Sequence, residues 1–322
     1  MSLLIYAESA EGKFKKVAFE LASYAKKVAE SLGTTVTAVT INTADVAELS
    51  KYGVDKVLKV SNDKLSAFSA KAYADVIKQA AQKESAKVVL LSSTTDSLYI
   101  APLVAVGLEA GFASNVIGLP VSVAPFQVKR NAFSNKAFTV TQIDTDVKVL
   151  SLAKNSYGLV EISGSAAAED FSPSLNDADF NVKVESVEKV SGKVTIADAE
   201  IVVSGGRGLK GPENWGMIEE LAAVLGAATA CSKPVSDLGW RPHSEHVGQT
   251  GKPVATNLYI AVGISGAIQH IAGINSSKVK LVINSDPEAP FFKVADYGVV
   301  GDAFEIVPKL IQKLKEFKAQ NS

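Results

Sequence analysis

Short apolar segments alternate with amphipathic helical patterns along most of the chain, and this alternation restricts the folds that are open to it. Leu3–Ala7 reads as a buried strand, and Lys13–Leu32 follows with apolar residues at helical spacing up to Gly33. The same order returns with short strands at 36–41, 57–60 and 87–92 and with helices at 44–52, 67–83 and 96–108. Strands that alternate with helices form parallel βαβ units, so we predict an α/β domain here.

The pattern changes at Val121, where strands joined by short turns are predicted at 127–133, 137–143, 147–152 and 159–162. We expect them to form an antiparallel addition to the parallel sheet. Gly164–Asp170 has the composition of a loop, and a new strand–helix pattern starts after Ser191-Gly192-Lys193. We therefore predict a domain boundary near residue 192, with an N-terminal scaffold domain at 1–192 and a doubly wound α/β domain at 193–322. The 322 residues agree with two domains of roughly 150 residues each.

Charge and cysteine content exclude several classes of function. The 33 basic and 34 acidic side chains leave a net charge of -1, which is no electrostatic footprint for nucleic acid. A single cysteine, Cys231, excludes an intrachain disulfide and a cysteine-based metal cage, and it is predicted to be a small buried residue. No apolar run reaches the ~20 residues of a membrane span, and the N-terminus lacks the basic region of a signal peptide. A cytoplasmic protein is expected, with a mature mitochondrial-matrix chain as the alternative.

The rarer residue types gather in the C-terminal half. All three histidines, His243, His246 and His270, lie there, and 14 of the 23 glycines lie between Gly205 and Gly301. Glycine permits sharp turns and close approach of the backbone to a ligand, and imidazole supplies positioned hydrogen-bond donors. The clustering predicts that the functional site is C-terminal.

A glycine-rich loop follows the first strand of this half. Gly206, Gly208 and Gly211 satisfy G-x-G-x-x-G between a strand at 200–204 and a helix at 213–225. This arrangement favours a dinucleotide pyrophosphate at the helix N-terminus. A nicotinamide dinucleotide site also needs an acid about 20 residues later, whereas residues 228–233 contain none. The loop therefore predicts a nucleotide, but not NAD in its standard pose.

Polar loops follow the later strands of this half as well. Val247–Gly251, Gly263–His270 and Asn284–Pro287 carry glycine or hydrogen-bonding side chains, and strands are predicted at 258–262, 279–283 and 297–300, followed by a helix at 304–317. Loops at the carboxyl ends of parallel strands converge on one ligand site.

Other uses of the notable residues have weaker support. His243 and His246 lack a third metal ligand at useful spacing, so no metal site is predicted. A Ser265–His270 dyad lacks an orienting acid, and Ser92–Asp96 is predicted to cap a helix rather than to bind an anion. From the residues alone, a nicotinamide dehydrogenase, a non-redox adenine-nucleotide module and a flavin electron carrier stay open.

Five C-terminal blocks carry a family resemblance. They are Ser204–Lys210 (SGGRGLK), Val247–Lys252 (VGQTGK), Leu258–His270 (LYIAVGISGAIQH), Ile283–Pro290 (INSDPEAP) and Val294–Asp302 (VADYGVVGD). In order and spacing they resemble the alpha subunit of electron transfer flavoprotein. The resemblance implies a heterodimer with a beta subunit that holds an AMP. It also implies one FAD, held mainly by the second domain, in an electron carrier that is not an enzyme with its own substrate.

The resemblance also implies the electron route and the cofactor contacts. Electrons would come from flavin dehydrogenases such as the acyl-CoA dehydrogenases of fatty acid β-oxidation and pass to a membrane-bound quinone oxidoreductase. Thr250 would lie near flavin N5, His270 near O2, the 265–270 segment at the pyrophosphate, and Asn284 with Asp302 at the adenosine. The implied FAD-site residues are Arg207, Ser232, Lys233, Val247, Gly248, Gln249, Thr250, Ser265, Gly266, Ala267, Ile268, Gln269, His270, Asn284, Asp302 and Ala303.

Two departures from the family pattern concern charge. Lys233 stands where the family usually has arginine, and Ser285 stands where it often has lysine. Lysine keeps the positive charge but loses the planar fork of arginine. A positive group at ~4 Å is worth up to about 4 kcal/mol at an effective dielectric of about 20. We therefore hypothesise that His270 and Lys233 raise the potential at which the flavin takes its first electron.

Overall fold

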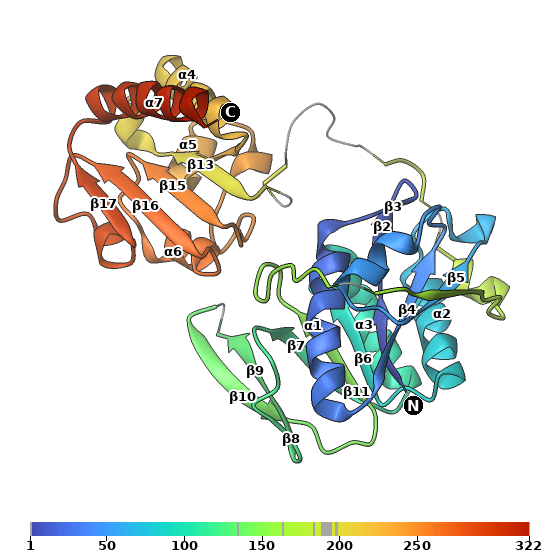
Figure 1. The fold of residues 1–322 in the computed structure, drawn as a ribbon. Coiled ribbons are helices and arrows are strands. Elements are labelled where there is room, and N and C mark those ends of the chain that lie inside the picture. The colour runs from blue at the N-terminus through green and yellow to red at the C-terminus, as the bar shows by residue number, and fades with distance from the viewer. Residues whose placement is uncertain are drawn as a thin grey trace. The chain divides into compact units, whose positions relative to one another are not determined.

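The computed structural model describes residues 2–133, 135–162, 164–182, 184–187, 195–196 and 199–321. The chain divides into two compact units (Figure 1). The N-terminal unit contains residues 1–132 and 137–187, and the C-terminal unit contains 133–136 and 188–322. The predicted boundary near residue 192 lies outside the described residues, so it stays a prediction.

The larger sheet of the described N-terminal unit is mostly parallel. Its order is β10-β9-β7-β11-β6-β1-β4-β5-β12, with β8 paired to β9. The parallel strands are β1 (Ser2–Tyr6), β4 (Thr35–Ile41), β5 (Lys56–Val60), β6 (Val88–Ser92), β7 (Gly111–Val116), β11 (Lys148–Leu152) and β12 (Ala167–Asp170). The antiparallel addition consists of β8 (Ser122–Val123), β9 (Phe126–Ala132) and β10 (Ala137–Gln142), and β2 (Ser9–Ala10) and β3 (Lys13–Phe14) form a separate ribbon.

Helices cover both faces of this sheet. The helix α1 (Lys16–Leu32) packs on one face, and α2 (Ala70–Lys83) and α3 (Thr95–Gly107) pack on the other (Figure 1). Strand β1 is buried on both sides, as expected for a parallel strand between two helical layers. These layers confirm the predicted α/β class of the first half.

Three predictions for this unit were wrong in detail. The 147–152 segment is not part of the antiparallel addition, because β11 inserts between β6 and β7 and is parallel to both. The 159–162 segment is not a strand. The 164–170 segment is not only loop, since β12 pairs with β5 as an edge strand, and Glu169 binds Lys56 and Lys83 at 2.7 and 2.8 Å. An edge strand with exposed side chains needs no apolar alternation, which is why its sequence resembled a loop.

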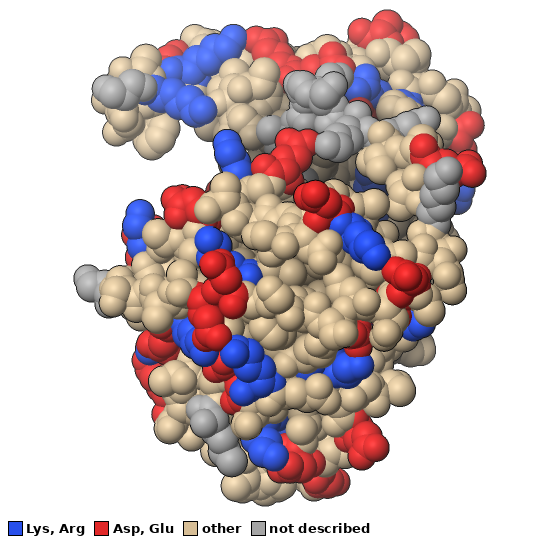
Figure 2. Space-filling view, turned by 90° about the vertical axis from the view of Figure 1, so that its right-hand side faces the viewer, with Lys and Arg blue, Asp and Glu red and all other residues tan. Residues whose placement is uncertain are grey.

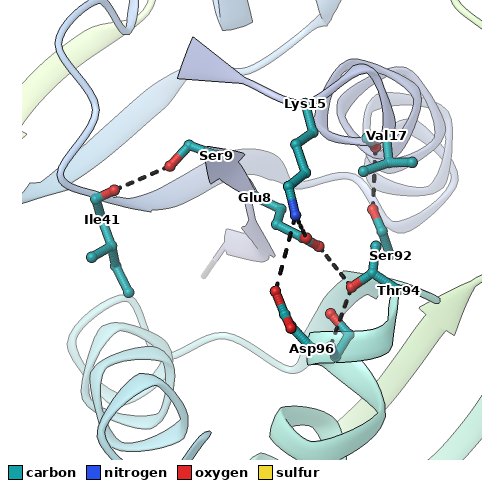
Figure 3. Close-up of polar contacts among 9 residues, drawn as sticks. Glu8, Ser9, Lys15, Val17, Ile41, Ser92, Thr94 and Asp96 are labelled. Carbon is teal, nitrogen blue, oxygen red and sulfur yellow. Dashed lines mark hydrogen bonds and ion pairs between the residues drawn. The ribbon is translucent and has the colours of Figure 1, made fainter. Parts of the chain in front are cut away.

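A polar cluster occupies the carboxyl edge of this sheet (Figure 3). Glu8, only 2% exposed, accepts a 2.7 Å hydrogen bond from the Thr94 hydroxyl and pairs with Lys15. Thr94 in turn caps α3, since its hydroxyl accepts from Ser97 N at 3.2 Å. Burial, followed by the charge of Glu8, raises the pKa of Asp96. The Ser92–Asp96 run is thus a helix cap, as predicted, and the carboxylates of Glu8 and Asp96 lie beside it, both within reach of Lys15.

Charges of both signs are mixed on the surface. Over the face drawn in Figure 2, lysines and arginines alternate with aspartates and glutamates, and neither sign forms a continuous field. A nucleic-acid site of the electrostatic kind requires a basic stripe, so this face does not resemble one. Among the described helices, none is both long and apolar enough to cross a membrane.

The C-terminal unit is a doubly wound parallel sheet, as predicted. Its described strands lie in the order β14-β13-β15-β16-β17. They are β13 (Ile201–Gly205), β14 (Ala228–Cys231), β15 (Leu258–Val262), β16 (Val279–Asn284) and β17 (Tyr297–Val300). The helices α4 (Gly216–Leu225), α5 (Lys233–Asp237) and α7 (Ala303–Gln320) pack on one face, and α6 (Ile268–Ile274) packs on the other (Figure 1). The strand order reverses between β13 and β15, which is where such sheets bind ligands.

Candidate functional site

A cavity of about 550 Å³ opens at the carboxyl ends of the C-terminal sheet. The loops after β13, β14, β15 and β16 all contribute to its wall, as does the 246–250 segment. Its volume falls within the roughly 300–1,000 Å³ of small-molecule and cofactor sites. The lining residues are Arg207, Gly208, Ser232, Lys233, Pro234, Asp237, His246, Val247, Gly248, Gln249, Thr250, Gly263, Ile264, Ser265, Gly266, Ala267, Gln269, His270, Asn284 and Asp286.

Most of the residues predicted for the site line this cavity, and three do not. Ile268 begins α6 and is 62% exposed. Asp302 caps α7, with its carboxylate accepting from Phe304 N at 2.9 Å, and Ala303 is the first residue of that helix. Asp302 and Ala303 therefore form the start of α7. Neither they nor Ile268 line the cavity.

Seven lining residues are absent from the implied FAD-site list, although Gly208, Gly263, Ile264 and Asp286 lie in loops that the sequence already assigned to a ligand site. They are Gly208, Pro234, Asp237, His246, Gly263, Ile264 and Asp286. Of the remaining three, two had a usable signal. Asp237 lies four residues after Lys233, the spacing of one helical turn, and His246 directly precedes the VGQTGK block.

The glycines of the G-x-G-x-x-G loop bring two loops together. A Cβ on Gly206 would lie 2.1 Å from the carbonyl oxygen of Gly263, and one on Gly208 would lie 2.7 Å from Gly263 Cα. The chain then makes short 3-10 turns before α4 begins at Gly216, and no described residue of α4 lines the cavity. The expectation of a pyrophosphate on the N-terminus of this helix is therefore not supported, because the glycines serve loop–loop packing.

Two buried imidazoles face the site without a full set of partners. His246 is 2% and His270 is 6% exposed, and both line the cavity. Among the described residues, Nδ1 of each has no partner at hydrogen-bond geometry. Buried polar atoms are almost always hydrogen-bonded in native proteins. Two such atoms on residues of one cavity wall are compatible with a ligand that carries hydrogen-bonding groups.

Burial keeps these rings neutral. It lowers the pKa of His270 to about 4, and the nearby His246 lowers it further. The pKa of His246 is also lowered, first by burial and then by His243 and Lys233. Near neutral pH, His270 is therefore a hydrogen-bonding group and not the fixed positive charge of the sequence hypothesis.

The positive charge of Lys233 is paired at the rim of the cavity. Its Nζ lies 2.9 Å from both carboxylate oxygens of Asp237, one helical turn later. Both side chains are about half exposed, so solvent screens the pair. An anion so close offsets much of the field that Lys233 alone would create in the cavity.

Asn284 ties two loops of the site together. Its Nδ2 donates to Ile264 O at 3.0 Å, and its Oδ1 accepts from Asp286 N at 3.0 Å. The side chain thus fixes the loop after β15 against the loop after β16.

Metal and thiol chemistry find no support here. Within the described residues, no group of three His, Cys, Asp or Glu side chains could hold a metal ion. Cys231 is buried, as predicted, and burial raises the pKa of its thiol to about 12. A thiol with so high a pKa is a poor nucleophile.

Comparison with known families assigns both units. Residues 3–175 match the family described as the electron transfer flavoprotein domain. Residues 195–275 match the electron transfer flavoprotein FAD-binding domain. The second match covers β13 to α6 and thus most of the cavity wall.

Curated relatives are similar over nearly the whole length. The electron transfer flavoprotein subunit alpha of Thermoanaerobacterium thermosaccharolyticum is 36% identical over 98% of both chains. The Bacillus subtilis subunit of the same name is 36% identical over 98% of this chain and 97% of its own. Protein FixB of Clostridium saccharobutylicum is 34% identical over 97% of this chain and 96% of its own.

Proposed function

This chain belongs to the electron transfer flavoprotein alpha subunits and carries their FAD-binding domain, and from this premise we propose that it is the FAD-carrying half of a heterodimeric electron carrier. It takes electrons from flavin dehydrogenases, such as acyl-CoA dehydrogenases, and passes them to a quinone oxidoreductase or a comparable acceptor. It has no substrate of its own. The bacterial relatives support a cytoplasmic location.

The donor set of the cavity fits FAD. The two orphaned imidazole nitrogens suit a ligand with hydrogen-bonding groups, and Ser265, Gln249 and Thr250 add hydroxyl and amide groups. Glycine also permits the close packing of the loops that form the wall. Gly266, with φ +88, lies so close to Phe291 that a Cβ would be 2.6 Å from its backbone nitrogen. This convergence of donors at the switch point of the sheet is the observation that carries the proposal.

When bound, FAD supplies the acceptance and release of electrons. The chain's own residues hold it and set its surroundings. We assign the flavin end to Thr250 and His270 and the pyrophosphate to the Ser265–Gln269 segment, as in the family. Because His270 is neutral and Lys233 is paired with Asp237, the proposed tuning of the potential rests mainly on hydrogen bonds and less on net charge.

The direct test is an absorbance spectrum of the chain co-expressed with its beta subunit and followed during stepwise dithionite reduction. We expect a yellow protein with one FAD per heterodimer, which bleaches on reduction. It should also be reduced by a flavin dehydrogenase supplied with substrate, and not by that substrate alone. A colourless protein that cannot be reconstituted with FAD would contradict the proposal. Binding of AMP alone, or of NAD, would favour the adenine-nucleotide module or the dehydrogenase instead.

The exposed face of α3 is the surface we propose for the partner subunit. The buried stripe of this helix packs on the sheet, whereas Leu98, Tyr99, Leu103 and Val106 are 45–79% exposed. Residues 99, 103 and 106 follow helical spacing and form a second apolar stripe on the same helix. Within the described residues these side chains stay exposed, and an exposed apolar helix face is typical of a protein interface. The relatives are named as subunits, which supports a second chain as its occupant.

Replacing Tyr99 and Val106 with aspartate is expected to dissociate the heterodimer while leaving the chain folded. Each change would bury a charge in an apolar contact, and an aromatic hot spot is worth about 2 kcal/mol or more, a weakening of at least about thirtyfold. Sedimentation of the two purified subunits measures it. Phe317→Asp is the matched control, because Phe317 is 63% exposed on α7 in the other unit. If the Tyr99/Val106 variant associated as tightly as the wild type, the interface would have to lie on another surface of the chain.

A further inference from the structure

A buried hydrogen bond behind the cavity links β15 to α6. The Tyr259 hydroxyl and Nε2 of His270 lie 2.9 Å apart. Tyr259 is fully buried, and its ring stacks on Phe291 at an interplanar angle of 4° and a centroid distance of 6.5 Å. Tyr259 itself does not line the cavity, whereas His270 does. Loss of the Tyr259 hydroxyl alone would therefore reach a cavity ligand through His270, since the ring stacked on Phe291 is kept.

The direction of this hydrogen bond follows from the groups around it. Burial raises the pKa of Tyr259 well above its ordinary value, so the phenol keeps its proton. The nearby Ser204 hydroxyl, on β13, acts in the opposite direction and lowers that pKa. In the described part of the chain, His270 Nε2 is the side-chain atom that the Tyr259 hydroxyl reaches at hydrogen-bond geometry, and a protonated phenol can donate to it. A neutral imidazole that accepts at Nε2 carries its own proton on Nδ1.

The other ring nitrogen is the one that the chain leaves open. Nδ1 of His270 is buried and has no partner at hydrogen-bond geometry among the described residues. The backbone of Val247 raises the pKa of His270, although it does not lie at hydrogen-bond geometry to Nδ1. His246, also neutral, is the other titratable group that acts on His270. An Nδ1 proton held in this place would be a buried donor without a partner in the ranges that the structure describes, on a ring that contributes to the cavity wall.

We propose that Tyr259 is a positioning residue that donates to Nε2 of His270, fixes the ring in the Nδ1-protonated tautomer, and so presents the Nδ1 proton to the flavin of bound FAD. This rests on the proposed function, in which the flavin end of FAD lies at His270. The side chain that orients the ring lies outside the cavity, and its hydroxyl acts on the cofactor through the imidazole. A donor aimed at a place where negative charge develops needs no reorganisation when the electron arrives.

The tautomer can be measured directly by ¹⁵N NMR of the full-length chain labelled in histidine. The chain has only three histidines, so three imidazoles appear, and His270→Gln identifies the relevant one. We expect Nδ1 of His270 to be protonated and Nε2 to be an acceptor in the chain without FAD. A proton on Nε2 would overturn the inference. The spectrum of the wild-type chain is enough to determine the tautomer of His270. The measurement therefore does not depend on whether a variant at Tyr259 folds.

The variant Tyr259→Phe removes the hydroxyl and keeps the aromatic stack on Phe291. We expect a mixture of His270 tautomers, a dissociation constant for FAD raised about tenfold, as for one buried hydrogen bond, and a lower potential for the first electron. Tyr24→Phe is the matched control, since Tyr24 is also fully buried and its hydroxyl donates to Gly118 O at 3.0 Å in the N-terminal unit.

The outcomes separate this inference from the proposed function. An Nδ1-protonated His270 that stays so in Tyr259→Phe, with FAD affinity and potential unchanged, overturns the positioning role alone. Failure of the wild-type heterodimer to bind FAD overturns the proposed function instead, because the tautomer measurement needs no cofactor.

Discussion

The substitution Gly206→Ala is expected to abolish FAD binding and to destabilise the C-terminal unit. Gly206 has φ -114 and ψ -178, an extended backbone that alanine also adopts, so the effect is purely steric. The added Cβ would lie 2.1 Å from the Gly263 carbonyl oxygen and 2.7 Å from its carbonyl carbon. Both are backbone atoms, which cannot rotate away. The two loops, which both contribute to the cavity wall, must then separate.

Separation of these loops breaks the hydrogen bonds that join them. Gly206 N donates to Val262 O at 2.8 Å, and Gly208 N donates to Gly263 O at 3.1 Å. Overpacking in a tight core costs about 1–3 kcal/mol, and we expect the upper end of this range here. Denaturant unfolding followed by tryptophan emission measures it, because Trp215 and Trp240 both lie in the C-terminal unit. Titration with FAD measures the loss of affinity.

Gly216→Ala serves as the matched control. Gly216 is the first residue of α4, and nothing lies within 4 Å of the position that its Cβ would take. Alanine there is expected to leave FAD binding unchanged and to stabilise the unit by about 0.5–1 kcal/mol or less. If Gly206→Ala bound FAD as tightly as the wild type, the loop at Gly263 would have to be free to withdraw, contrary to its packing.

The second large effect is the loss of stability of the C-terminal unit in acid. The pKa of His270 is about 4 in the folded chain against 6.5 in the unfolded chain. The unfolded chain therefore takes up a proton below pH 6.5 that the folded chain does not. Its contribution to stability is present above pH 6.5 and is lost as the pH falls toward 4. At 1.36 kcal/mol per pKa unit, the whole loss is about 3 kcal/mol, and about 2 kcal/mol is lost by pH 5.

Comparison with His270→Gln isolates this contribution. Unfolding of the FAD-free chain at pH 7 and pH 5, again followed by tryptophan emission, should show a pH effect about 2 kcal/mol smaller in the variant. Carboxylates of the unit titrate in both proteins and cancel in the difference. The lowered pKa of His246 also makes the chain less stable in acid, and this contribution is present in both proteins and cancels in the difference. Equal pH dependence in both proteins would show that His270 is solvated and protonated in the folded chain.

Some structural features were predictable because their causes are local. The buried strand at Leu3–Ala7, the helix ended by Gly33 and the Thr94 cap depend on periodicity and on residues that are neighbours in the sequence. The order of strands and helices then predicted two α/β sheets. Strand β12 escaped prediction, because its pairing with β5 comes from a segment more than a hundred residues away. Strand β11 was misplaced for the same reason, since only tertiary pairing inserts it between β6 and β7.

The sequence by itself determined the α/β class, the C-terminal position of the site and the family. These depend on periodicity and on short motifs of glycine, histidine and amide side chains, whose order along the chain is fixed. Only the tertiary structure decided what those residues do. In the folded chain, Gly206 and Gly208 pack against Gly263, and Lys233 forms an ion pair with Asp237. Asp302 caps α7, and His246 lines the cavity. Tyr259 lies behind His270. Charge state, burial and hydrogen-bond direction depend on the groups that folding brings together, and no local pattern contains them.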